Sequence, residues 1–143
     1  MQSENTIVKN SKAMTITGWV LSVLVILFLL MDGIVKLLPI PDVIEIGRKI
    51  GFADGAMIPV GIVIVICTVL YAIPQTAMLG AVLLTGHLGG AVAMHVRVSA
   101  PENNLGFGGE PFSIIFPIII GLFIWGGLYF RDGRLRSLIP LRK

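Results

Sequence analysis

The sequence predicts an all-α protein that crosses a lipid bilayer four times. Hydrophobic residues make up 55% of the 143 residues and charged residues only 13%, whereas about a quarter of the residues in ordinary soluble domains are charged. A helix needs about 20 apolar residues to cross about 30 Å of hydrocarbon. Four apolar stretches of roughly this length fill most of the chain: Ala13–Leu38, Ala56–Ile73, Thr76–Val96 and Ser113–Phe130. We therefore expect a single transmembrane four-helix bundle over residues 1–143, without a separate soluble module.

The first span is expected to end near Leu38, because Pro39 and Pro41 follow it and proline does not continue a helix. Over Asp42–Ile50, apolar residues recur at helical spacing with charged residues between them. This pattern is typical of a short amphipathic helix that lies on a membrane surface. Asp54 comes just before the second span, and its carboxylate is expected to cap that helix.

Small residues mark the third span as a packing helix. Gly86 and Gly90 lie one helical turn apart, the spacing at which two helix backbones approach closely in lipid. We expect this helix at the centre of the bundle, packed on the fourth span or, as the less favoured alternative, on another copy of the chain. The glycines assigned to helix packing are Gly80, Gly86, Gly89 and Gly90. The connection after this span, residues 99–111, is expected to be a flexible loop or a lid.

The distribution of charge predicts the orientation of the spans. With four spans, both termini and the turn at Pro74 share one side, which also carries seven basic residues: Lys9, Lys12, Arg131, Arg134, Arg136, Arg142 and Lys143. Basic residues in short flanks favour the cytoplasmic face, so both termini are expected in the cytoplasm. The basic tail is interpreted as a topology signal that meets anionic lipid, and not as a nucleic-acid site. An interfacial aromatic belt is expected at the same level from Trp19, Tyr71, Trp125 and Tyr129.

Ionisable residues inside the apolar helices form the candidate site. Each costs about 2.5–3.5 kcal/mol at mid-helix and therefore needs a partner or a role. Lys36 follows Asp32 by one helical turn and can pair with it. Because the first and third spans run parallel, His95 and Arg97 are expected to face that pair across the bundle. Two interpretations stay open: a closed structural network, or a polar pocket open to the outer leaflet.

His87 lies on roughly the same helix face as His95, two turns deeper. Eight residues span about 12 Å along a helix, which is too far for both rings to bind one metal ion, and we expect no metal site. His87 is interpreted either as a hydrogen-bonded neutral histidine or as a proton relay or cofactor contact. Cys67 is the only cysteine, so dithiol chemistry within the chain is excluded.

Three stretches of the chain carry a distinctive combination of motifs: MDGIVKL, YAIPQTAMLGAVLLTGHLGGAVAMHVR and FPIIIGLFIWGGLYFRDGRLRSLIP. Together they resemble the DoxX-like family of small four-helix membrane proteins. This resemblance implies a bundle usually found in the bacterial inner membrane, and some relatives are linked to quinone-reducing oxidoreductase systems. It places an outer polar motif on Asp32, Lys36, His95 and Arg97, a close-packing motif on Gly80, Gly89 and Gly90, and an inner tail on Arg131, Asp132 and Arg134. At His87 the family commonly has a bulky aromatic residue.

These observations support two classes of function. The first is an accessory protein of the inner membrane that binds quinone or docks with a membrane redox partner, and that has no redox centre of its own. The second is a membrane enzyme acting on a small lipophilic substrate, with Asp32 or His95 as general acid or base. The lipid bilayer is the expected environment, a redox partner or a second copy of the chain is the expected protein partner, and no cofactor is evident beyond the quinone that the resemblance implies.

Overall fold

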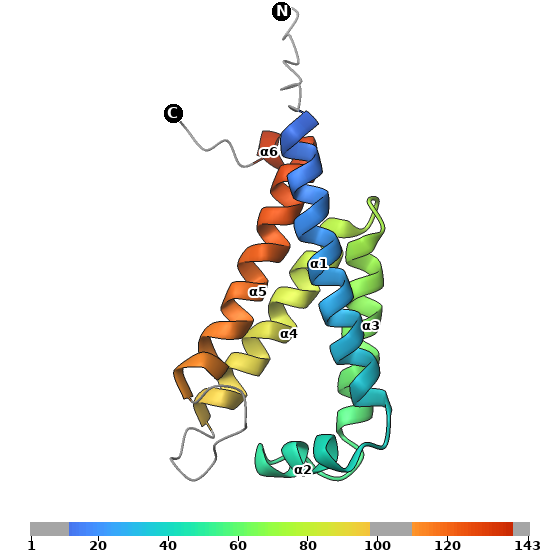
Figure 1. Ribbon diagram of the computed structural model, residues 1–143, viewed down its shortest axis with the longest axis vertical. Coiled ribbons are helices and arrows are strands. Elements are labelled where there is room, and N and C mark those ends of the chain that lie inside the picture. The colour runs from blue at the N-terminus through green and yellow to red at the C-terminus, as the bar shows by residue number, and fades with distance from the viewer. Residues whose placement is uncertain (1–11, 98–109, 139–143) are drawn as a thin grey trace, which may run out of the picture.

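The structure is a computed structural model that describes residues 12–97 and 110–138, and every regular element in these residues is a helix. The helices are α1 (Lys12–Leu37), α2 (Pro41–Lys49), α3 (Met57–Ala72), α4 (Ala77–Arg97), α5 (Glu110–Arg131) and α6 (Gly133–Leu138). Figure 1 shows the four long helices side by side, with α2 across one end and α6 at the other. We call these the α2 end and the terminal end. The predicted all-α class is confirmed.

Three helices have the length and apolar composition needed to cross a membrane: α1, α4 and residues Pro111–Arg131 of α5. They coincide closely with the first, third and fourth predicted spans. The second predicted span corresponds to α3, which is apolar but has only 16 residues, or about 24 Å of helix. Of the predicted connection at residues 99–111, only Glu110 and Pro111 lie within the described residues, and they begin α5.

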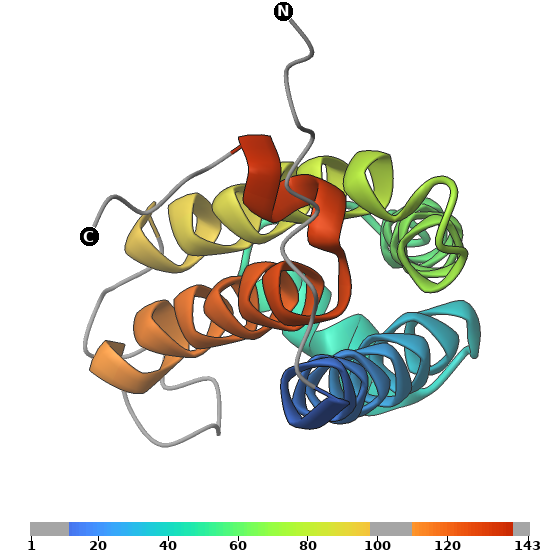
Figure 2. The same cartoon turned by 90° about the horizontal axis from the view of Figure 1, so that it is seen from above.

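The four long helices are arranged as a ring in the order α1, α3, α4, α5, as Figure 2 shows from above. Each helix packs against its two neighbours in the ring, so α4 contacts α3 and α5 but lies diagonally opposite α1. The prediction that α4 forms the centre of the bundle is therefore wrong. In Figure 1 the pair α1 and α3 diverges from the pair α4 and α5 toward the α2 end. This divergence determines where the chain can enclose a cavity.

Glycines allow the closest helix contacts, which lie in the half of the bundle near the terminal end. A Cβ on Gly80 of α4 would lie 2.2 Å from the backbone nitrogen of Tyr71, and one on Gly18 of α1 would lie 2.5 Å from that of Arg131. Real Cβ atoms do not approach backbone this closely, so only glycine permits these contacts. The prediction of a close approach at Gly80 agrees with this geometry.

The other three glycines assigned to packing lie in a different environment. A Cβ at Gly86, Gly89 or Gly90 would meet nothing within 4 Å. The prediction of close packing within the chain is wrong for these three, which are exposed, because this part of α4 has diverged from α3. Small-residue spacing shows that a helix offers a smooth face, but it does not show what covers that face.

Tyr71 is a buried junction and not part of an interfacial belt, because its side chain is 0% exposed. Its hydroxyl donates a hydrogen bond to the carbonyl oxygen of Ile124 on α5 at 2.9 Å. Since that bond uses the only hydroxyl proton, Ser22 of α1 is the donor in the 3.1 Å bond between the two hydroxyls. Arg131 donates from Nη2 to the carbonyl oxygen of Tyr71 at 2.6 Å. Tyr71 thereby joins α1, α3 and α5.

The amphipathic helix predicted at Asp42–Ile50 is confirmed as α2. Its apolar residues are half-buried and its charged residues are exposed. The predicted cap at Asp54 is wrong: Ala56 is the N-cap of α3 and makes no side-chain cap bond. Both carboxylate oxygens of Asp54 instead accept hydrogen bonds from Arg48, at 2.6 and 2.7 Å. The positive φ angle of Gly55, 82°, lets the chain turn sharply between this ion pair and α3.

Candidate functional site

A cavity of about 400 Å³ lies between the diverging helices at the α2 end. Its walls come from α1, α3, α4 and α5, and the segment after α2 contributes Ile50 and Phe52. One feature of the sequence and one of the fold leave this space open. Gly86 and Gly90 present no side chains on the wall formed by α4, and the helices on either side have separated at this level.

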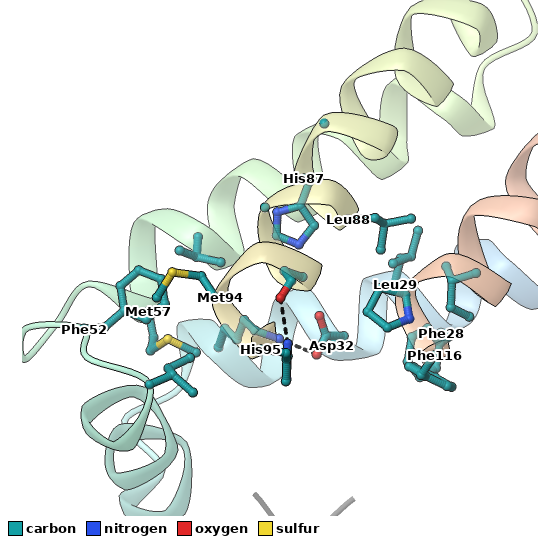
Figure 3. A pocket seen from close by; sticks show the side chains of 18 residues that line it. Phe28, Leu29, Asp32, Phe52, Met57, His87, Leu88, Met94, His95 and Phe116 are labelled. Atoms are coloured by element: carbon teal, nitrogen blue, oxygen red, sulfur yellow. Dashed lines mark hydrogen bonds and ion pairs between the residues drawn. The ribbon is translucent and has the colours of Figure 1, made fainter. Parts of the chain in front are cut away.

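Most of the cavity wall is apolar. Phe28 of α1 and Phe116 of α5 make an edge-to-face contact with ring centroids 5.3 Å apart, and both line the cavity. Figure 3 shows this pair on one side of the space, and Phe52 and Met57 on the other. Aromatic and methionine side chains at these positions suit a flat or flexible apolar ligand, because both types pack well against such groups.

The polar part of the lining consists of two residues from each of two facing helices. Asp32 and Lys36 come from α1, and His87 and His95 come from α4. Figure 3 shows Asp32, His87 and His95 around the same space. Asp32 and Lys36 form an ion pair along their own helix, with side chains 35% and 19% exposed. The pair therefore neutralises itself while remaining in reach of the cavity.

His95 has a defined orientation. Its Nδ1 lies 2.7 Å from the carbonyl oxygen of Ala91, one turn earlier on α4. A carbonyl can only accept, so Nδ1 carries the proton, and Nε2 is the acceptor nitrogen when the ring is neutral. An imidazole held in one tautomer can accept a proton or a hydrogen bond in a defined direction.

Arg97 lies at the end of α4, is exposed and is not part of the cavity lining. Successive residues on a helix are 100° apart, so Arg97 is rotated about 200° from His95 and points to the other side. The expectation that Arg97 faces Asp32 is corrected for this reason. His87, eight residues before His95, is rotated by only about 80° and does line the cavity.

The predicted network of four polar side chains is therefore incomplete, because Arg97 is not part of the lining that Asp32, Lys36 and His95 share. The ion pair lies within one helix. Within residues 12–97 and 110–138, no group of three His, Cys, Asp or Glu side chains is placed to hold a metal ion. Cys67 is buried in the core at 5% exposure. The site offers charge, hydrogen bonds and apolar surface.

Sequence reasoning found the polar residues of the site and missed its apolar wall. Phe28, Phe116 and Pro117 all line the cavity. Their positions in the sequence could have pointed to them. Phe28 lies one turn before Asp32 on α1, and Pro117 lies inside α5, where it interrupts the regular backbone hydrogen bonds of a membrane helix.

Comparison with known proteins identifies one relationship. A sequence profile of the DoxX-like family matches residues 20–127. No curated protein and no solved structure gives a significant match. The matched region covers α2, α3 and α4, together with the parts of α1 and α5 that line the cavity.

Proposed function

The chain belongs to the DoxX-like family of membrane proteins, and from this premise we propose that it is an accessory protein of the bacterial inner membrane that binds a lipophilic ligand of the quinone class. The proposed bundle has four spans, with α3 as the shortest, and places both termini in the cytoplasm. The ligand enters the cavity at the α2 end, in the outer half of the bundle. A membrane redox partner reduces or oxidises the bound ligand.

The observation that carries this proposal is the composition of the cavity. Its volume of about 400 Å³ falls within the range of about 300–1,000 Å³ that is usual for small-molecule sites. A quinone ring is flat and apolar and carries two carbonyl acceptors. The aromatic and methionine side chains suit the ring, and the ammonium of Lys36 is a donor for such oxygens. Nε2 of His95 is an acceptor, because the Nδ1 proton is bonded to Ala91, and it suits the hydroxyl of the reduced quinol form.

The orientation of the spans is proposed from charge. Lys12, Arg131, Arg134 and Arg136 all lie on helices that begin or end at the terminal end, whereas Lys9, Arg142 and Lys143 lie outside the described residues. Reporter enzymes fused after Arg136 and within residues 98–109 test this orientation. The proposal requires the first reporter in the cytoplasm and the second outside it.

Two adjacent glycines of α4 allow a matched test of ligand binding. Gly90 lines the cavity, whereas Gly89 does not, and a Cβ at either would meet nothing within 4 Å. Gly90→Leu should fill the cavity and weaken binding of decylubiquinone by about tenfold or more, the cost of overpacking a formed site being about 1–3 kcal/mol. Gly89→Leu changes helix propensity equally and should leave the dissociation constant unchanged.

Isothermal titration of the detergent-solubilised protein with decylubiquinone measures both constants. Equal affinities for the two leucine variants and the natural chain would place the ligand elsewhere. Binding that is absent in all three would reject the quinone class.

Catalysis on a small lipophilic substrate is the second candidate. It is favoured by one observation, the presence of a carboxylate and two imidazoles in the lining of one apolar cavity. The two functions differ in what His95 does. In a binding protein, His95→Gln weakens affinity, whereas in an enzyme it removes turnover while substrate still binds.

A further inference from the structure

Three buried guanidinium nitrogens at the terminal end have no hydrogen-bond acceptor. They are Nη1 of Arg131 and Nε and Nη2 of Arg136, and among the described residues they are the buried side-chain nitrogen and oxygen atoms without a partner. Buried polar atoms in folded proteins nearly always have a partner, and an exception requires an explanation. The Arg136 guanidinium lies against Met14 of α1, whereas Arg131 lines a hollow at the α5–α6 junction, so Nη1 of Arg131 is the orphan donor that a ligand in that hollow could satisfy.

Arg131 is held in one orientation by its surroundings. Its guanidinium carbon lies 4.9 Å from the ring centroid of Trp19 and 4.6 Å from that of Tyr71, and its Nη2 donates to the carbonyl oxygen of Tyr71. One edge of the guanidinium is thus committed to the fold, and Nη1 is uncommitted. An arginine fixed in this way loses little conformational freedom when it binds an anion.

A hollow of about 270 Å³ adjoins this arginine. It lies at the opposite end of the bundle from the quinone cavity, between the α3–α4 turn and the α5–α6 corner. Its charged lining residues are Arg131, Asp132 and Arg134, and Gln75 adds an amide. The carboxylate of Asp132 accepts the backbone N–H of Arg134 at 2.9 Å. With two cations and one anion, the lining carries a net positive charge.

We propose that this hollow binds a phosphate group, with Arg131 as the oriented donor and Arg134 and Gln75 as further donors at its rim. A guanidinium fork matches the geometry of phosphate oxygens better than an ammonium does. Trp19 lines the same hollow and is 41% exposed, as suits an indole at the level of lipid headgroups. Two sources carry this chemistry, the headgroup of an anionic lipid and a soluble phosphate ester, and the site is independent of the quinone proposal.

Titration of the purified protein in neutral detergent tests the site with three probes. Dioctanoyl phosphatidylglycerol carries chains and phosphate, dioctanoylglycerol carries the chains alone, and glycerol phosphate carries the headgroup alone. Arg131→Gln and Arg134→Gln should each weaken phosphatidylglycerol binding by about tenfold, because each removes a charge-assisted donor. Arg97→Gln, an equal change of charge at the exposed end of α4, should leave binding unchanged.

The outcomes distinguish a lipid headgroup from a soluble phosphate ester, and two of them would overturn the proposal. Binding of phosphatidylglycerol but not of glycerol phosphate assigns the site to lipid, whereas binding of both with the same dependence on Arg131 and Arg134 assigns it to the phosphate ester itself. Dioctanoylglycerol binding as tightly as phosphatidylglycerol overturns the proposal. So does equal loss of binding in Arg97→Gln and Arg134→Gln. If Arg131→Gln does not fold, Arg134→Gln decides, since that side chain is exposed.

Discussion

Tyr71 connects three helices of the bundle through its hydrogen bonds. Its hydroxyl links α3 to the backbone of α5 and to Ser22 of α1, and its own carbonyl oxygen accepts from Arg131. The sequence placed this tyrosine near a membrane interface, where it is typical. The reason it is buried is visible only in three dimensions, since Gly80 lets α4 pack directly on its backbone.

Removing the hydroxyl of Tyr71 should destabilise the fold measurably. Tyr71→Phe leaves the Ile124 carbonyl and the Ser22 hydroxyl without this partner in a buried place, at a cost of about 1–3 kcal/mol. Thermal unfolding in detergent, followed by circular dichroism, should show a lower midpoint. Tyr129→Phe is the matched control, because the Tyr129 hydroxyl has no hydrogen-bond partner among the described residues and its ring contact with Phe130 is kept. Similar unfolding midpoints for the two variants would show that the Tyr71 hydroxyl does not stabilise the fold.

At the scale of elements, periodicity and length predicted the helices well. The spans α1, α4 and α5 follow from runs of apolar residues that only a membrane helix needs, and α2 follows from its amphipathic spacing. What could not be predicted is which helix faces are covered. Gly80 and Gly90 look equivalent in the sequence, yet one lies against α3 and the other lines a cavity, because the helices diverge between them.

The connection between α2 and α3 makes its own prediction about pH. Hydrogen bonds from Arg48 lower the pKa of the Asp54 carboxyl below its ordinary value of 3.8. A carboxylate with a lowered pKa in the folded state contributes stability above the ordinary pKa, and this contribution is lost as pH falls through the folded value. The ion pair should therefore order the end of α2 at neutral pH and release it only in strong acid.

Hydrogen exchange of the α2 amides, corrected for intrinsic rates, measures this contribution. Asp54→Asn should reduce the protection of α2 at pH 7 and have a smaller effect near pH 3, below the ordinary pKa of 3.8. Adding Arg48→Gln to Asp54→Asn should change protection no further, because the pair is already broken. An effect of Asp54→Asn that is the same at both pH values would show that the ion pair is not its cause.

At the scale of the whole molecule, the two ends of the bundle differ in packing and in chemistry. The terminal end is closed by glycine contacts and by the Tyr71 hydrogen bonds, and its hollow is cationic. The α2 end is open, and its cavity is mainly apolar with two histidines and one ion pair. The residues Asp32, Lys36, His87 and His95 could be found from the sequence because ionisable groups in apolar helices are conspicuous. The cavity could not, because it depends on the divergence of whole helices.

Photolabelling with an azido-quinone tests the central claim most directly. The natural protein is illuminated with the probe in detergent, digested, and the modified residues are located by mass spectrometry. We predict label on the cavity wall, on Met94, His95 or Phe116, and its loss when excess decylubiquinone competes. Label that persists under competition, or that falls on the exposed outer faces of the helices, would contradict a ligand site at the α2 end.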